Sequence, residues 1–120
     1  MPNQVWHDSI TNNGEDMTNI LDDLYKIICS RKKADKSVSY VAKLFSKGRK
    51  KIAQKVGEEA VETVIAALAE GKPELISESA DLLFHLLVLW AECGVEPKEI
   101  MAELERRKEK GKNPDKPQPI

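Results

Sequence analysis

Residues 51–92 carry the pattern from which the architecture follows, and they read KIAQKVGEEAVETVIAALAEGKPELISESADLLFHLLVLWAE. Apolar residues recur through both halves of this segment at the period of an α-helix, so the segment predicts two long helices. Each helix carries acids along one stripe, which spans about 100° on the first helix and about 60° on the second. The stripes contain Glu58, Glu59 and Glu62 on the first helix and Glu74, Glu78, Asp81, His85 and Glu92 on the second.

The connection between these helices indicates how the two stripes meet. Gly71 is a natural helix stop and Pro73 suits the first turn of the next helix, so the segment predicts an antiparallel hairpin. Measured along the helices from Gly71, Glu62 lies about 13 Å and Glu59 about 18 Å along the first arm. On the second arm, Glu78 lies about 10 Å and Asp81 about 15 Å from Gly71. The two pairs of carboxylates are therefore predicted to face each other at nearly the same level. One pair is Glu59 and Glu62, and the other is Glu78 and Asp81.

Carboxylates held at this density require compensation. Removing each charge from water costs several kcal/mol unless another charge or a metal offsets it. A set of exposed ion pairs is the simpler explanation, but the apolar remainder of residues 75–91 offers no basic partners. We therefore favour a metal site, and all-oxygen ligands predict Mg²⁺, with Mn²⁺ as the other candidate. A di-iron bundle is disfavoured because its Glu-x-x-His pairs are absent.

His85 lies one turn beyond Asp81 on the same stripe. We interpret it as a buried histidine that is hydrogen-bonded to the Asp81 carboxylate and does not itself bind the metal. We prefer this interpretation to a direct catalytic role.

A basic segment from Lys43 to Lys55 leads into the first acidic stripe. A solvated helix start explains any one of these residues, but the set favours phosphate binding because Lys51 and Lys55 share the face of the carboxylates. No Walker-type glycine loop is present, so phosphates would be held by metal and side chains. The predicted phosphate-binding residues are Lys47, Arg49, Lys51 and Lys55.

The whole chain fits one domain. It has 120 residues, a formal net charge of -1 and 5% aromatic residues, which gives no support to nucleic-acid or membrane binding. Two cysteines fit no metal-ligand spacing, no signal peptide opens the chain, and the apolar run of residues 82–91 is too short to span a bilayer. These features predict a cytoplasmic protein.

The predicted fold is all-α with four or five helices in residues 16–109. A first helix runs from Asp16 or Thr18 to about Arg31, Ser39 caps a short helix, and Pro97 starts a last helix that ends near Lys108. Residues 1–15 are predicted to be loose and residues 110–120 to form a disordered tail. The second acidic helix has more apolar surface than one copy can cover, which predicts a helical bundle completed in a homodimer or larger even assembly.

The motif Glu58-Glu59-x-x-Glu62 followed by Glu78-x-x-Asp81 resembles the signature of the all-α, MazG-like nucleoside triphosphate pyrophosphohydrolases. Within that superfamily, residues 39–48, 55–60 and 78–86 are similar to the phosphoribosyl-ATP pyrophosphatase family of histidine biosynthesis, and the likeness covers roughly residues 18 to 108. The resemblance implies that Glu59, Glu62, Glu78 and Asp81 are metal ligands and that Glu58 adds a ligand or serves as the general base.

The resemblance further implies Mg²⁺-dependent hydrolysis of phosphoribosyl-ATP at its α/β phosphoanhydride, which yields phosphoribosyl-AMP and pyrophosphate. One alternative is a housecleaning pyrophosphohydrolase that acts on non-canonical or pyrimidine dNTPs with the same carboxylates. A second alternative is a non-catalytic dimeric helical module in which the acids hold a structural cation. The match upstream of the acids, from Ser39 to Lys55, favours the first assignment.

Overall fold

The structure is a computed structural model, and it describes residues 16–110. This range contains five α-helices and no strand, which confirms the predicted all-α fold. The predictions for residues 1–15 and 111–120 lie outside the described residues. The helices are α2 (Asp16–Ser30), α3 (Tyr40–Lys47), α4 (Arg49–Ala69), α5 (Lys72–Cys93) and α6 (Pro97–Glu109).

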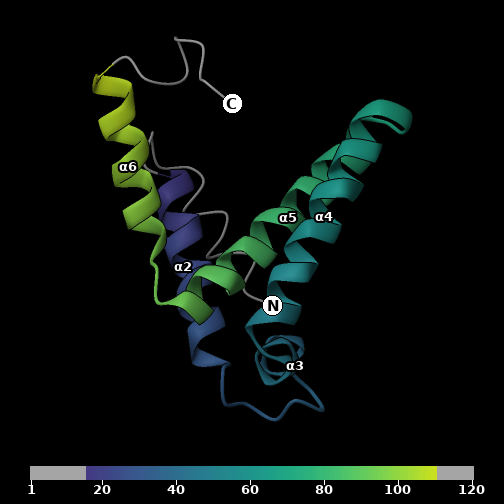
Figure 1. Cartoon of the computed structure of the whole chain (residues 1–120), viewed down its shortest axis with the longest axis vertical. Coiled ribbons are helices and arrows are strands. Elements are labelled where there is room, and N and C mark those ends of the chain that lie inside the picture. The colour runs from purple at the N-terminus through teal and green to yellow at the C-terminus, as the bar shows by residue number, and fades with distance from the viewer. Residues whose placement is uncertain (1–15, 111–120) are drawn as a thin grey trace.

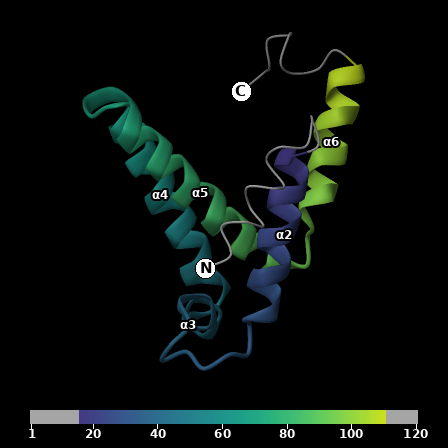
Figure 2. The same ribbon diagram turned by 180° about the vertical axis from the view of Figure 1, so that it is seen from behind.

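The helices are arranged as an open V (Figure 1). The α4–α5 hairpin forms one limb, and α2 runs antiparallel to α6 in the other, as the view from behind also shows (Figure 2). The limbs meet where the C-terminal part of α5 packs against α2, while α3 lies below the start of α4. The most extensive helix packing in the described range is between α4 and α5, the two helices that carry the acids.

The helix ends follow the sequence signals. Ser39 caps α3, because its Oγ accepts a hydrogen bond from the N–H of Ala42 at 3.1 Å. The N–H of Gly71 donates to Glu74 Oε1 at 3.1 Å, so Glu74 caps the start of α5 instead of joining the acids further along that helix. Gly48, at φ 92°, and Gly94, at φ 75°, end α3 and α5 in backbone conformations that other residues rarely adopt.

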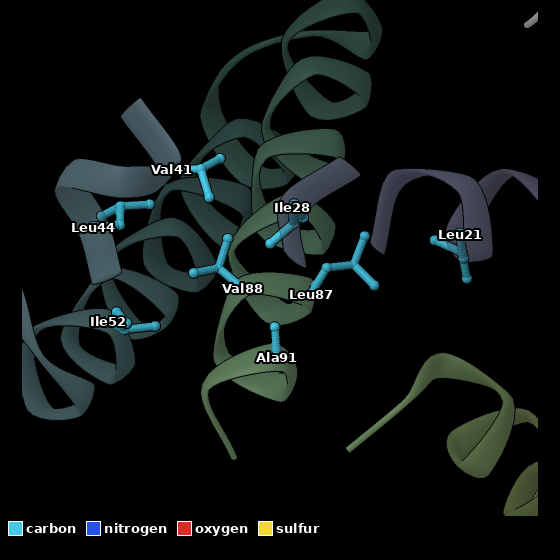
Figure 3. Close-up of a cluster of buried hydrophobic side chains, with 8 residues drawn as sticks. All are labelled: Leu21, Ile28, Val41, Leu44, Ile52, Leu87, Val88 and Ala91. Carbon is cyan, nitrogen blue, oxygen red and sulfur yellow. The ribbon is translucent and has the colours of Figure 1, made fainter. Parts of the chain in front are cut away.

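The hydrophobic core lies at the base of the V (Figure 3). Fully burying one such aliphatic side chain stabilises a fold by about 1.5–3 kcal/mol. This packing fixes α3 and the start of α4 against α5, and therefore sets the position of the lysines relative to the acids. The core side chains come from α2, α3, α4 and α5, and they are Leu21, Ile28, Val41, Leu44, Ile52, Leu87, Val88 and Ala91.

The α4–α5 limb also carries large apolar side chains that the described part of the chain leaves uncovered. Six of them expose between 44% and 83% of their surface: Val61, Val64, Ile65, Leu68, Ile76 and Leu83. Scattered apolar exposure is ordinary, but a row on two adjacent helices is a feature of association surfaces. Among the described helices, none combines the length and apolar character that a membrane crossing requires.

Candidate metal centre and basic cavity

Three carboxylates converge in the α4–α5 limb. Glu59 on α4 and Glu78 and Asp81 on α5 each offer an oxygen atom, and these atoms lie within 4.8 Å of one another. Glu59 is buried, with a relative exposure of 7%. The hairpin connection at Gly71 therefore brings the two acidic stripes to one level.

The carboxylates of this cluster are only partly compensated: Lys55 Nζ lies 3.6 Å from Glu59 Oε2, but two other carboxylate oxygens have no partner. Glu59 Oε1 and Glu78 Oε1 are buried and accept no hydrogen bond from residues 16–110. Desolvation raises the pKa of Glu78, and the neighbouring carboxylates Glu62, Asp81 and Glu59 raise it further. Buried polar atoms are normally paired, so these oxygens leave ligand positions for a cation. Their all-oxygen chemistry fits a hard divalent ion such as Mg²⁺.

Glu62 lies beside the cluster rather than within it. Its carboxyl group is close enough to Glu78 to share a hydrogen bond and raise that residue's pKa, while most of Glu62 faces solvent. The structure thus brings three of the four predicted metal ligands, Glu59, Glu78 and Asp81, into one cluster, with Glu62 beside it. The roles of all four as ligands stay predictions.

Lys55 links the acids to a basic cavity. Its Nζ lies 3.6 Å from Glu58 Oε1 and 3.6 Å from Glu59 Oε2, as helical spacings of three and four residues allow. Partial burial disfavours the charged ammonium, but Tyr40, Glu59 and Glu58 together raise the pKa of Lys55 above its usual value. Lys55 therefore stays charged beside the acids.

Glu58 occupies a different environment from Glu59. It is exposed, and its Oε2 accepts a hydrogen bond from Gln54 Nε2 at 2.9 Å. This hydrogen bond, with the nearby Lys55 and Lys51, lowers the pKa of Glu58. Glu58 is therefore an ionised carboxylate that can accept hydrogen bonds. It is next to Glu59 in the sequence, and Lys55 Nζ lies 3.6 Å from both carboxylates.

The basic cavity lies between α3 and the first half of α4 and has a volume of about 210 Å³. Lys47, Lys51 and Lys55, all predicted to bind phosphate, line it, and Lys43 lines it too. Arg49 does not contribute to its lining: Arg49 Nε lies 3.6 Å from Glu92 Oε2, and its Nη2 donates to the main-chain oxygen of Glu92 at 3.4 Å. Arg49 thus holds the start of α4 against the end of α5.

His85 is buried, as predicted, but its predicted hydrogen bond to the Asp81 carboxylate is wrong. His85 Nδ1 lies 2.8 Å from the main-chain oxygen of Asp81, and Nε2 lies 2.9 Å from Tyr40 Oη. The imidazole reaches back along the helix to the carbonyl four residues earlier, while the Asp81 side chain faces the other acids. Tyr40 also stacks on Phe84, with ring centroids 6.2 Å apart.

Sequence reasoning missed two residues that shape the site, Tyr40 and Thr63. Thr63 Oγ1 lies 2.8 Å from the main-chain oxygen of Glu59 and 3.2 Å from that of Glu78, so its hydroxyl can donate to either arm of the hairpin. Thr63 follows Glu59 by four residues, which is a helical spacing that could have identified it. Tyr40 gives no comparable signal, because its partner lies far along the chain.

A larger cavity, of about 620 Å³, lies between α2 and α6. Its charged lining mixes Asp22 and Glu96 with Lys26 and Lys98, so opposite charges offset one another. It contains none of the converging acids of the α4–α5 limb. The smaller basic cavity is therefore the better candidate for a polyanion.

Known proteins are similar to this chain over most of its length. The family described as phosphoribosyl-ATP pyrophosphohydrolase matches residues 21–108. The chain belongs to this family. It is 68% identical over 88 residues to a phosphoribosyl-ATP pyrophosphatase of Paramagnetospirillum magneticum, covering 73% of this chain and 81% of the relative. It is 54% identical over 89 residues to that of Saccharolobus solfataricus, covering 74% and 95%.

A third relative, the phosphoribosyl-ATP pyrophosphatase of Rhizorhabdus wittichii, is 59% identical over 91 residues, which covers 76% of this chain and 86% of the relative. The family match includes the whole of α3, α4 and α5, and with them every residue of the acid cluster and the basic cavity. The family that the motifs predicted is confirmed, and with it the assignment to an enzyme family. The roles of the individual residues stay predictions.

Proposed function

We propose that this chain hydrolyses phosphoribosyl-ATP between its α and β phosphorus atoms and releases phosphoribosyl-AMP and pyrophosphate, as a step of histidine biosynthesis. The observation that carries this proposal is the convergence of Glu59, Glu78 and Asp81 beside a lysine-lined cavity. The names of the three relatives support the choice of substrate.

The proposed cofactor is Mg²⁺, with Mn²⁺ as a substitute, held by Glu59, Glu62, Glu78 and Asp81. The buried, unpaired oxygens of Glu59 and Glu78 support this ligand set. When bound, the divalent ion supplies charge compensation for the triphosphate and lowers the pKa of a water molecule.

The chain's own groups then have separate roles. Lys51, Lys55 and Lys47 bind phosphate oxygens through charge-assisted hydrogen bonds. Glu58 is ionised because Gln54 and Lys55 hold its pKa low, so it can accept the proton of the attacking water. Arg49 supports the site by tying α4 to Glu92 on α5 rather than by direct contact in the cavity.

The active form is proposed to be a cytoplasmic homodimer or larger even assembly. The row of exposed apolar side chains on the α4–α5 limb supports association of two copies through this limb. Leu68, 83% exposed near the hairpin tip, offers a direct test. Leu68→Lys should shift the sedimentation of the protein toward the monomer, whereas an unchanged assembly would place the interface elsewhere.

The activity is tested by incubating the purified chain with phosphoribosyl-ATP and, separately, with a panel of dNTPs in the presence of Mg²⁺. Pyrophosphate release from phosphoribosyl-ATP is the expected result. Exclusive turnover of dNTPs would favour a housecleaning enzyme on the same carboxylates. No turnover of any nucleotide would favour the non-catalytic module.

The metal is tested separately by thermal unfolding with Mg²⁺ and with a chelator. A ligand that binds only the folded state stabilises it by about 2.7 kcal/mol at a concentration of 100 times its Kd. We expect Mg²⁺ to raise the Tm of the wild type but not that of Asp81→Asn. Equal stabilisation of both proteins would remove Asp81 from the ligand set.

A further inference from the structure

The basic cavity between α3 and α4, called here the lysine pocket, has more basic than acidic side chains in its lining. Its charged lining consists of Lys43, Lys47, Lys51, Lys55 and Glu58. Four ammonium groups line the pocket with one carboxylate, and Lys55 Nζ also lies 3.6 Å from Glu59 Oε2, so an excess of two positive charges remains. A cavity with this charge is suited to a compact polyanion.

The lysines of this pocket are largely available for a ligand. Within residues 16–110, Lys43 and Lys47 form no ion pair, and Lys51 Nζ lies 3.5 Å from the side-chain oxygen of the neutral Gln54. The one carboxylate, Glu58, already accepts a hydrogen bond from Gln54 and lies 3.6 Å from Lys55 Nζ. Lys43 and Lys47 on α3 are therefore not ion-paired with any described residue around the pocket.

We propose that the lysine pocket binds the terminal diphosphate of the substrate, the two phosphoryl groups that leave as pyrophosphate. This assignment rests on the proposed function, because it takes the α/β bond as the one that breaks. It also adds Lys43, on α3, to the residues that contact the substrate.

The position of Lys55 favours the diphosphate over the substrate's other phosphate group. Lys55 lines the pocket and lies 3.6 Å from Glu59 Oε2 in the acid cluster. The pocket therefore adjoins the acids, which favours an occupant attached directly to the phosphorus atom that reacts there. The 5′-phosphate of the phosphoribosyl unit is separated from the triphosphate by the whole nucleoside, so it cannot occupy the adjacent position.

Charge gives the same preference. A phosphate monoester carries about -1.5 to -2 at neutral pH and a diphosphate carries more, so a diphosphate interacts more strongly with the four ammonium groups. The pocket is also poorly suited to a nucleobase. Its aromatic side chain, Tyr40, already stacks on Phe84 and contacts His85 edge-on, and its hydroxyl is bonded to His85.

The lysine pocket would act on the leaving group during hydrolysis. The water oxygen forms a bond to the α phosphorus, and a carboxylate takes the water proton. The bond between the α phosphorus and the α/β bridging oxygen breaks, and its electron pair stays on that oxygen as part of the diphosphate. Lysines around the diphosphate stabilise this added negative charge, and such stabilisation is stronger in the transition state than in the bound substrate.

The test is the binding of inorganic pyrophosphate to the full chain, measured by calorimetry in the presence of Mg²⁺. The variant is Lys43→Gln/Lys47→Gln, and the matched control is Lys36→Gln/Lys50→Gln, which removes the same charge from exposed lysines outside the pocket. We expect the Kd for pyrophosphate to rise about tenfold or more in the pocket variant, since charge-assisted hydrogen bonds to phosphate are lost, and to change little in the control.

Two results would overturn the assignment. One is an equal pyrophosphate affinity in the pocket variant and the matched control. The other is a fall in affinity for ribose 5-phosphate with no fall for pyrophosphate, which would make the pocket a monoester site. Lys51→Gln repeats the measurement with a lysine of α4, which lines the opposite side of the pocket from α3. Thermal melts verify that each variant is folded.

The binding measurement separates this inference from the proposed function, because it needs no turnover. Hydrolysis of phosphoribosyl-ATP by the wild type, with pyrophosphate affinity unaffected by the pocket variant, would reject the diphosphate pocket alone. Conversely, lost pyrophosphate binding in the pocket variant would support the pocket even if the wild type left phosphoribosyl-ATP intact, in which case the proposed function fails.

Discussion

The hydroxyl of Tyr40 on α3 is joined to the imidazole of His85 on α5, with Oη 2.9 Å from Nε2. His85 Nδ1 faces the main-chain oxygen of Asp81 at 2.8 Å, and a carbonyl oxygen can only accept, so Nδ1 carries a proton. In the neutral imidazole with its proton on Nδ1, Nε2 is an acceptor and the Tyr40 hydroxyl donates to it. This pair connects the helix that bears Lys43 and Lys47 to the helix that bears Asp81.

Removal of that hydroxyl should loosen α3. Tyr40→Phe keeps the ring on Phe84 but leaves the buried Nε2 of His85 without its donor, so we expect a loss of about 1–3 kcal/mol in the free energy of unfolding. Urea unfolding measures this loss. A double-mutant cycle with His85→Leu should give a coupling of about 1 kcal/mol. Additive effects of the two changes would mean that the hydrogen bond contributes nothing to stability.

Glu78→Gln should separate stability from activity. Desolvation and the charges of Glu62, Asp81 and Glu59 raise the pKa of Glu78, so neutralising it relieves repulsion in the metal-free protein. We expect a Tm in chelator equal to or above that of the wild type. We also expect kcat/KM to fall by at least about 100-fold, since even a hydrogen-bond partner of a metal ligand is typically worth 10- to 100-fold.

Glu70→Gln is the matched control for Glu78→Gln, because Glu70 is exposed at the end of α4 and lies outside the acid cluster. It should leave both the Tm in chelator and kcat/KM close to the wild-type values. A clear drop in the Tm of Glu78→Gln would show that this carboxylate stabilises the fold without metal.

Two glycines should respond oppositely to alanine. Gly57 lies inside α4, and a Cβ added there would meet nothing within 4 Å, so Gly57→Ala should stabilise the chain by roughly 0.5–1 kcal/mol. Gly48 has equal space but φ +92° and ψ 167°, a conformation adopted almost only by glycine, so Gly48→Ala should destabilise by about 1–3 kcal/mol. Chemical denaturation measures both. A loss of activity in Gly57→Ala despite greater stability would indicate that substrate or a second copy approaches α4 closely at this residue.

Acid should weaken the last helix at a predictable pH. Hydrogen bonds from Arg106 and Arg107 hold the pKa of Glu103 at about 2, below its ordinary value of 4.5. A lowered folded-state pKa gives stability that is present above about pH 4.5 and is lost as the pH falls toward about 2. Thermal melts of the wild type and Glu103→Gln should therefore differ at pH 6 and converge near pH 2. A constant difference over this range would contradict the assignment.

The sequence was sufficient to predict contacts that depend on helical geometry alone. Acids at fixed spacings on two helices, with Gly71 and Pro73 between them, predicted that Glu59, Glu78 and Asp81 would meet, and they do. It was also sufficient for helix ends, because capping uses neighbouring residues such as Ser39 and Gly94. These features are local, so periodicity and residue chemistry determine them.

Contacts between residues of different helices that are far apart in the sequence were harder to predict from the sequence. Arg49 was grouped with the phosphate-binding lysines, but the packing of α4 against α5 brings it to Glu92. The bond between Tyr40 and His85 depends on how α3 docks against α5 through the hydrophobic core, which no spacing along the chain reveals. Uncovered apolar surface was predicted for residues 76–91 of α5, whereas four of the six exposed apolar side chains of this limb lie on α4. The partner that covers them stays a prediction.

The single hairpin that carries Glu59 and Glu78 has a consequence for how the chain folds. Glu59 and Glu78 come together as soon as α4 packs against α5. Contacts between segments that are close in sequence form early in folding because closing a short loop costs little entropy. We therefore expect the cation site to exist before α2 and α6 have docked. An ion bound at the proposed site at that stage would favour the closed hairpin, so we expect Mg²⁺ to accelerate refolding, as stopped-flow measurements with Mg²⁺ and with chelator would detect.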